Sequence, residues 1–195
     1  MVKKILLSVL FVFPAICAFA DIWLDPVITS TFSQNKEYML KVYPTKYPDN
    51  YFSFKYQRKY KKGIIKDTVN PCHAILYQIF NSDTIEIWNK PLVNFLSPVR
   101  VIVANDGKSV VTFDDWGFRG GNHTVVIYGE NGVLIQDFKL EDISAFSIEQ
   151  YPRSISSIFW GYGEYLDNDR VEIYFKNEYG EEKQKIFNIK KRVFE

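Results

Sequence analysis

The most regular pattern of apolar and polar positions in the chain lies in residues 98–143. The run VRVIVANDGKSVVTFDDW is followed by a Gly-rich loop, FRGGNH, and then by TVVIYGENGVLIQDFKLEDI. Turn residues at Asn105-Asp106-Gly107 and Asn131-Gly132 separate β-branched and aromatic stretches, and Asn and Gly tolerate the positive φ angles of hairpin turns. The pattern predicts a four-stranded antiparallel meander.

The strands of this meander carry apolar side chains at successive positions. Val110 is followed by Val111, and Val125 by Val126. Neighbouring residues of a strand point to opposite faces of a sheet, so both faces are expected to be covered. The pattern therefore places the meander in the middle of the fold.

Looser versions of the pattern occur on either side. Residues 31–44 align with residues 102–115, with Leu40 over Val111, and residues 72–92 align with the second half of the meander. This similarity predicts two four-strand units, at about 27–96 and 98–143. After a short helix within 140–148, we expect a strand over 155–162 and a hairpin with one wet face, together spanning about 154–190.

These elements define an all-β fold. We expect a single domain over residues 21–195, built of antiparallel meander units with at most one short helix. Three arrangements of such units fit the pattern: a small ring of blades, an open propeller-like stack, or a β-sandwich.

The segments NDGKSVVTFDDW and VVIYGENGVLIQDFKLEDI, with the glycine-bearing loop between them, resemble a group of exported bacterial proteins of unassigned function. The segments of those proteins look like β-propeller blades. The resemblance covers about residues 98–162. It implies an exported, β-rich domain with blade-like units, and it carries no catalytic motif. At roughly 40 to 45 residues a blade, the mature chain would form at best a four-bladed ring.

Residues 1–20 have the pattern of a signal peptide. Lys3 and Lys4 precede a mostly apolar run, and Ala18-Phe19-Ala20 is a small-x-small cleavage signal. The run is shorter than the roughly 20 residues that cross a bilayer, and no second apolar stretch follows it. A lipoprotein is disfavoured because the bulky Ile16 precedes Cys17. We therefore predict a periplasmic or secreted protein with no transmembrane segment in the mature chain.

Net charge and cysteine content exclude further classes of protein. The formal net charge is +1, and loss of Lys3 and Lys4 with the signal peptide makes the mature chain −1. This balance argues against a protein that mainly neutralises phosphates, and nucleic acid is not an expected partner outside the cytoplasm. Cys72 is the one cysteine left, so no intrachain disulfide can form. A buried, inert thiol is the favoured interpretation and pairing between chains the alternative.

A polar cluster is predicted where two strands of the meander end. It comprises Asp114, Asp115, Trp116, Asn122 and His123. Polar groups beside an aromatic ring at the end of a sheet are a common way to bind a ligand. The competing interpretation is structural: the aspartates cap a loop and Trp116 closes the core. We predict no metal site and no cofactor, because the required motif spacings are absent.

The segment FSFKYQRKYKKGIIK is the one strongly charged stretch. Its basic patch consists of Lys55, Arg58, Lys59, Lys61 and Lys62, interleaved with aromatic residues. Such a segment binds anionic surfaces in many proteins, which makes an anionic envelope component or glycan a candidate partner. The alternative is a projecting hairpin that lysines keep soluble.

The sequence thus favours an exported, non-catalytic binding or envelope-associated module of unknown ligand. Two alternatives stay open. A secreted hydrolase would need the Asp/His cluster of the 114–123 loop within hydrogen-bond reach in a cleft. A glycan or peptidoglycan binder would expose coplanar rings among Trp116, Trp160, Tyr162 and Tyr165.

Overall fold

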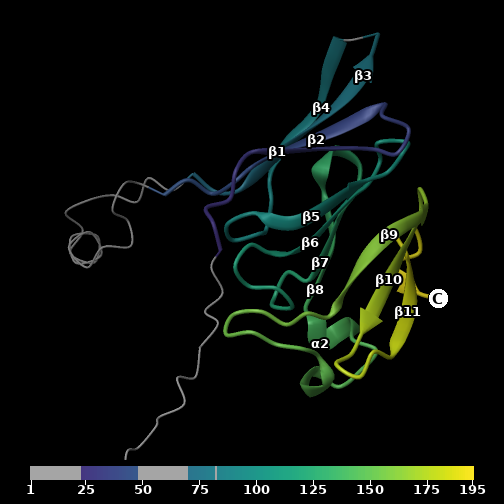
Figure 1. Ribbon diagram of the computed structural model, residues 1–195. Coiled ribbons are helices and arrows are strands. Elements are labelled where there is room, and N and C mark those ends of the chain that lie inside the picture. Colours follow the sequence, from purple (N-terminus) through teal and green to yellow (C-terminus); the bar gives the residue numbers. More distant parts are fainter. Residues whose placement is uncertain (1–22, 48–69, 82) are drawn as a thin grey trace, which may run out of the picture.

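The computed structural model describes residues 23–47, 70–81 and 83–195, which form three four-stranded antiparallel sheets (Figure 1). The first sheet contains β1 (Thr29–Phe32), β2 (Tyr38–Tyr43), β3 (His73–Phe80) and β4 (Asp83–Pro91). The second contains β5 (Pro98–Val103), β6 (Val110–Asp115), β7 (Val125–Tyr128) and β8 (Leu134–Phe138). The third contains β9 (Gly161–Asp167), β10 (Arg170–Lys176), β11 (Glu182–Asn188) and β12 (Val193–Phe194).

Helical structure is minor in this part of the chain. The short α-helix α2 spans Leu140–Ile143, and single 3-10 turns lie at Glu130–Gly132 and Ile148–Gln150. The prediction of an all-β fold with at most one short helix is therefore confirmed for the described residues.

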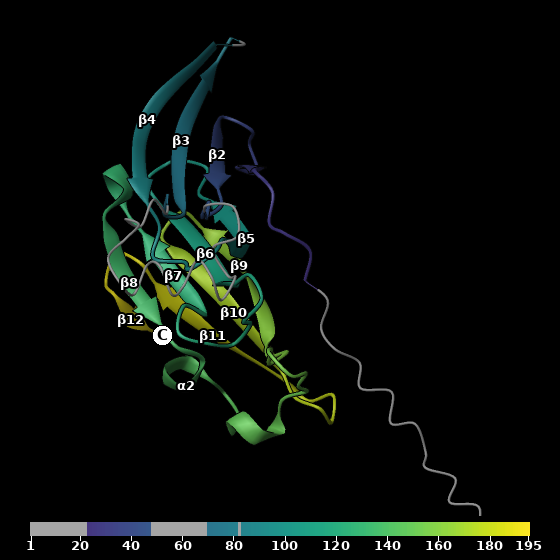
Figure 2. The same ribbon diagram turned by 90° about the vertical axis from the view of Figure 1, so that its left-hand side faces the viewer.

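The second sheet lies between the other two (Figures 1 and 2). Val111 and Phe113 on one face pack into a core shared with Val171, Ile173 and Phe175 of the third sheet. On the opposite face, residues of β5, β6 and β7 pack against Leu40, Val42 and Trp88 of the first sheet. Every residue of β6 and β7 is buried. The prediction of a meander covered on both faces is confirmed.

The third sheet has one core face and one wetter face, as the period of two in β10 predicts. Val171, Ile173 and Phe175 are fully buried. Tyr174 is half-buried and Lys176 exposed on the other face. Three sheets are fewer than the four blades of the smallest propeller ring, so the described residues form an open stack.

The prediction of a strand over residues 155–162 is wrong. β9 begins only at Gly161, and the residues before it turn back on themselves, since the Ser154 N–H donates to the carbonyl of Ser157 at 2.9 Å. Trp160 and Ile158 of this loop pack into the core, whereas Ile155 and Phe159 are exposed. The short strand β12 then pairs with β11, so the C-terminal unit is a four-stranded sheet instead of a strand and a hairpin.

The first hairpins of the first two sheets have the same register. Thr31 pairs with Leu40 as Ile102 pairs with Val111. In the second hairpins the sequence alignment is one residue out of step: Leu76 lies beside Leu40, whereas Ile127, not Val126, lies beside Val111. A slip of one residue exchanges the two faces of a strand.

Asparagines join the first turns of the three sheets. The Asn35 N–H donates to the side-chain oxygen of Asn105 at 2.9 Å, and the Asn105 N–H donates to that of Asn168 at 3.1 Å. These bonds align the three turns at one end of the stack.

Candidate functional site

Asp114 lies at the end of β6 with its side chain buried. Its Oδ1 accepts hydrogen bonds from the Gly120 N–H at 2.7 Å and from the Trp160 indole Nε1–H at 2.9 Å, and its Oδ2 lies 3.4 Å from Arg119 Nε. Burial raises the pKa of this carboxyl, and the three donors oppose the rise. Asp114 also has a φ of 55°, a conformation that Asp tolerates better than most residues. The carboxylate thus fixes the loop that follows β6.

The neighbouring Asp115 points to a different partner. Its Oδ1 accepts hydrogen bonds from Asn94 Nδ2 at 3.0 Å and from the Phe95 N–H at 2.9 Å. Burial raises the pKa of this carboxyl as well. Asp115 therefore ties the connection between β4 and β5 to the central sheet.

The other members of the predicted cluster also separate. The indole of Trp116 donates to the carbonyl of Leu24 at 2.7 Å and packs edge-on against Trp23. His123 Nδ1 lies 3.0 Å from a carboxylate oxygen of Asp137, while Asn122 is exposed. The loop brings the five residues into one region, but their side chains do not converge on a shared cavity.

Two further sequence predictions concern Cys72 and the basic patch. Cys72 is 1% exposed, and burial raises the pKa of its thiol to about 12. Its neighbour His73 points to the opposite face and stacks on Tyr43 at 4.7 Å. The basic patch, Lys55, Arg58, Lys59, Lys61 and Lys62, lies outside the described residues, and its role stays a prediction.

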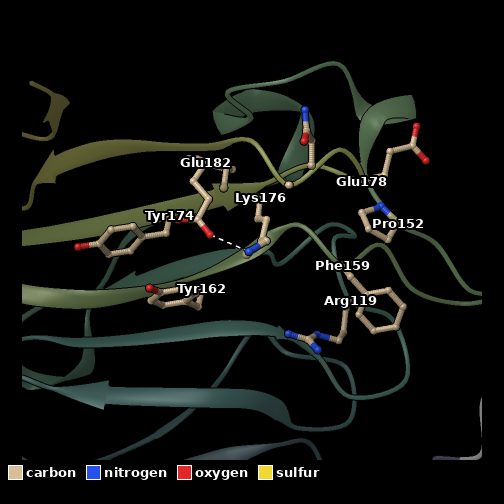
Figure 3. A pocket seen from close by; sticks show the side chains of 12 residues that line it. Arg119, Pro152, Phe159, Tyr162, Tyr174, Lys176, Glu178 and Glu182 are labelled. Carbon is tan, nitrogen blue, oxygen red and sulfur yellow. Dashed lines mark hydrogen bonds and ion pairs between the residues drawn. The ribbon is translucent and has the colours of Figure 1, made fainter.

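A cleft of about 460 Å³ opens where the third sheet meets two loops (Figure 3). Its volume falls within the usual range of ligand pockets, roughly 300 to 1,000 Å³. Its lining residues are Arg119, Pro152, Phe159, Gly161, Tyr162, Tyr174, Phe175, Lys176, Asn177, Glu178, Gly180 and Glu182. A larger hollow on the first sheet is lined in part by Lys46 and Asn70.

Aromatic rings form two sides of the cleft. Tyr162 is 49% exposed and stacks on Tyr174, with ring centroids 4.8 Å apart and an interplanar angle of 19°. Phe159 is 41% exposed and lies on the other side, beside Arg119 (Figure 3). The Tyr174 hydroxyl donates to the Glu172 carboxylate, which raises the pKa of Tyr174. The rings therefore give the cleft apolar walls with polar edges.

Charged groups lie between these rings. Lys176 Nζ donates to Glu182 Oε1 at 2.8 Å, and this carboxylate raises the pKa of Lys176. The Arg119 guanidinium lies 5.6 Å from the centre of the Phe159 ring, a cation–π distance. The cleft thus offers both hydrogen-bond donors and acceptors beside apolar surface.

Asp114 does not line the cleft, but its carboxylate positions residues that form the cleft walls. It binds Arg119, which lines the cleft, and Trp160, which lies between the lining residues Phe159 and Gly161 in the chain. Gly161 has a φ of 150°, and a Cβ there would overlap the Tyr174 carbonyl. The close approach of β9 to β10 at this point therefore requires glycine.

The sequence indicated this cleft only through Tyr162, which stood among the possible saccharide-binding rings. The other three rings of that set do not form an exposed array: Trp160 is buried, Trp116 contacts Leu24, and the Tyr165 hydroxyl bonds to Ser109. Arg119, Phe159, Tyr174 and Lys176 were missed. No motif links them, because they come together only when the loops fold onto the third sheet.

Within the described ranges, no group of three or more His, Cys, Asp or Glu side chains is placed to hold a metal ion. Within the same ranges, no helix has the length and apolar character needed to cross a membrane.

Comparisons of the chain with protein-family models, curated proteins and solved structures found no match. The likeness to exported proteins with blade-like segments stays a prediction.

Proposed function

We propose that this protein is an exported, non-catalytic binding module whose ligand occupies the cleft between Phe159 and the Tyr162–Tyr174 pair. The observation that carries the proposal is the cleft itself: its volume is about 460 Å³, and aromatic rings line it together with hydrogen-bond donors and acceptors. Concave sites of this size with a few polar groups are the usual form of small-ligand sites.

A saccharide of the cell envelope is the ligand class that suits these walls. Sugars have apolar C–H patches beside many hydroxyl groups, and Tyr162 and Phe159 offer ring surface beside Lys176 and Glu182. The N-terminal signal-peptide pattern supports a location where such saccharides occur. The basic patch supports association with anionic envelope material by the same reasoning.

Binding is favoured over hydrolysis by the bonds of the two aspartates. Asp114 accepts from Gly120 and Trp160, and Asp115 accepts from Asn94 and Phe95, so both carboxylates already hold the fold together. His123 contacts Asp137 in place of either aspartate. The cleft lining contains no Ser, Cys, His or Asp, and of its two carboxylates, Glu178 and Glu182, the second accepts a hydrogen bond from Lys176. The hydrolase alternative therefore gains no support from the geometry.

The test is calorimetric titration of the mature protein with oligomers of N-acetylglucosamine and with soluble peptidoglycan fragments. Tyr162→Ala should weaken binding about tenfold, because it removes half-exposed ring surface from the cleft wall. Tyr179→Ala is the matched control, since Tyr179 is 71% exposed on the nearby turn but does not line the cleft. Equal affinities of Tyr162→Ala and wild type, or no binding of any probe to wild type, would contradict the proposal.

A further inference from the structure

Arg119 differs from the other cation of the cleft in how it is neutralised. Lys176 is paired directly with Glu182 at 2.8 Å. Arg119 faces Asp114 through Nε alone, at 3.4 Å, which is long for a charge-assisted hydrogen bond of about 2.7 to 2.9 Å. Asp114 accepts its shorter hydrogen bonds from Gly120 and Trp160. Arg119 is thus only loosely held by its carboxylate.

The two terminal nitrogens of Arg119 have no hydrogen-bond acceptor among the residues that the structure describes. The side chain is 30% exposed, so a large part of it is already shielded from water. In Figure 3 the guanidinium extends into the cleft from beside Phe159 toward Tyr162. A guanidinium in this position has donors free for a ligand.

The carboxylates of the cleft do not compensate for Arg119. Glu182 is engaged by Lys176. The carboxylate of Glu178 points away from Arg119 in Figure 3. A planar anion from outside could therefore bind Arg119 through two parallel hydrogen bonds, the geometry that the guanidinium fork favours.

We propose that the ligand of the cleft is an acidic saccharide whose carboxylate binds Arg119 while its ring lies between Phe159 and Tyr162. This inference rests on the proposed saccharide-binding function and adds the charge of the ligand to it. Arg119 is then the specificity-determining residue, because it distinguishes an acidic sugar from its neutral counterpart.

Two pairs of saccharides test the role of the ligand carboxylate, because in each pair only one member carries it. N-acetylmuramic acid differs from N-acetylglucosamine by an ether-linked group that ends in a carboxylate, and glucuronic acid differs from glucose by oxidation at one carbon. Wild type should bind the acidic member of at least one pair at least tenfold more tightly, and the preference should shrink as salt is added. Arg119→Gln should abolish the preference, so that the two members of each pair bind with similar affinity.

The control is Lys176→Gln combined with Glu182→Gln, which removes the paired charges from the same cleft and should keep the preference. Because Arg119 also faces Asp114, each variant is checked by near-ultraviolet circular dichroism. If Arg119→Gln does not fold, Arg119→Lys carries the test: it keeps the charge but lacks the fork, so most of the preference should still be lost.

The outcomes separate the two proposals. Equal binding of acidic and neutral sugars by wild type, or a preference that survives in Arg119→Gln or Arg119→Lys, overturns the role of Arg119 and leaves the saccharide-binding proposal standing. Absence of binding by both members of both pairs and by the longer oligomers overturns both.

Discussion

The indole of Trp160 donates a 2.9 Å hydrogen bond to the buried carboxylate of Asp114, joining two residues 46 positions apart in the sequence. Asp114 is the last residue but one of β6 in the central sheet, and Trp160 immediately precedes β9 of the third sheet. The same carboxylate binds the loop that carries Arg119. This relationship sets two walls of the cleft relative to each other.

Replacement of Asp114 should therefore destabilise the protein strongly. Asp114→Ala leaves the Gly120 N–H and the Trp160 indole without acceptors and puts alanine at a φ of 55°. Buried donors left unsatisfied cost about 1–3 kcal/mol each, so we expect a loss of about 2–4 kcal/mol in the free energy of unfolding, measured in urea.

Two variants control this measurement. Asp114→Asn keeps an oxygen acceptor and tolerates the backbone conformation, so it should lose about 1 kcal/mol or less. Asp83→Ala changes an exposed aspartate and should stay within about 0.5 kcal/mol of wild type. A loss in Asp114→Ala no larger than that in Asp83→Ala would show that the bonds of Asp114 do not stabilise the fold.

The free energy of unfolding should depend on pH because two carboxyl groups are buried in the folded state. Burial raises the pKa of Asp114 and of Asp115 above the usual value of 3.8, so the folded state holds protons that the unfolded chain has released. The contribution of these groups to the free energy of unfolding therefore falls as pH rises from 3.8 through the raised pKa values.

Urea titrations at several pH values between about 3.5 and 7 test this, with Asp114→Asn as the comparison. The variant lacks one of the two groups, so its stability should fall less over the same interval. A steeper fall in Asp114→Asn than in wild type would contradict the assignment of a raised pKa to Asp114.

Much of the fold could be predicted because the central sheet has an unambiguous pattern. Successive apolar residues such as Val110 and Val111 require cover on both faces, and the structure provides it. The strand over 155–162 was mispredicted because apolar residues such as Ile155, Ile158 and Phe159 are typical of strands, but here they lie in a loop where Ile155 and Phe159 are exposed. Composition could not reveal the turn between Ser154 and Ser157.

The candidate site was less predictable for a physical reason. Asp114 and Asp115 are adjacent, and a polar cluster was a fair expectation, but successive residues of a strand point to opposite sides. One carboxylate therefore reaches Trp160 and the other reaches Asn94. Arg119 lies in a loop and Tyr174 in β10, and no sequence motif indicates that both side chains line the same cleft.

The shared register of the first hairpins makes a paired prediction. Gly107 has a φ of 68°, and Lys36 has a φ of 63° at the matching turn position. Gly107→Ala should lose about 1–3 kcal/mol, because its backbone is left-handed and a Cβ there would overlap the Tyr38 ring. Lys36→Gly should instead stabilise the protein, by up to about 1 kcal/mol. Thermal unfolding of both variants measures this, and the same sign in both would refute the matched geometry.

The thiol of Cys72 should be unreactive in the folded protein. It is buried, and its pKa of about 12 leaves little thiolate at neutral pH. Iodoacetamide should therefore label native protein far more slowly than urea-unfolded protein at about pH 8. Equal rates in the two states would show that the core between the first and second sheets is open at Cys72.

Backbone amide shifts during titration with acidic and neutral saccharides test the central claim most directly. The cleft predicts that the largest changes fall on Gly161, Tyr162, Lys176 and Gly180, with the 122–123 segment and the first sheet little affected. Changes confined to Asn122 and His123 or to the first sheet, or no changes at saturating probe, would contradict a ligand site between Phe159 and Tyr162.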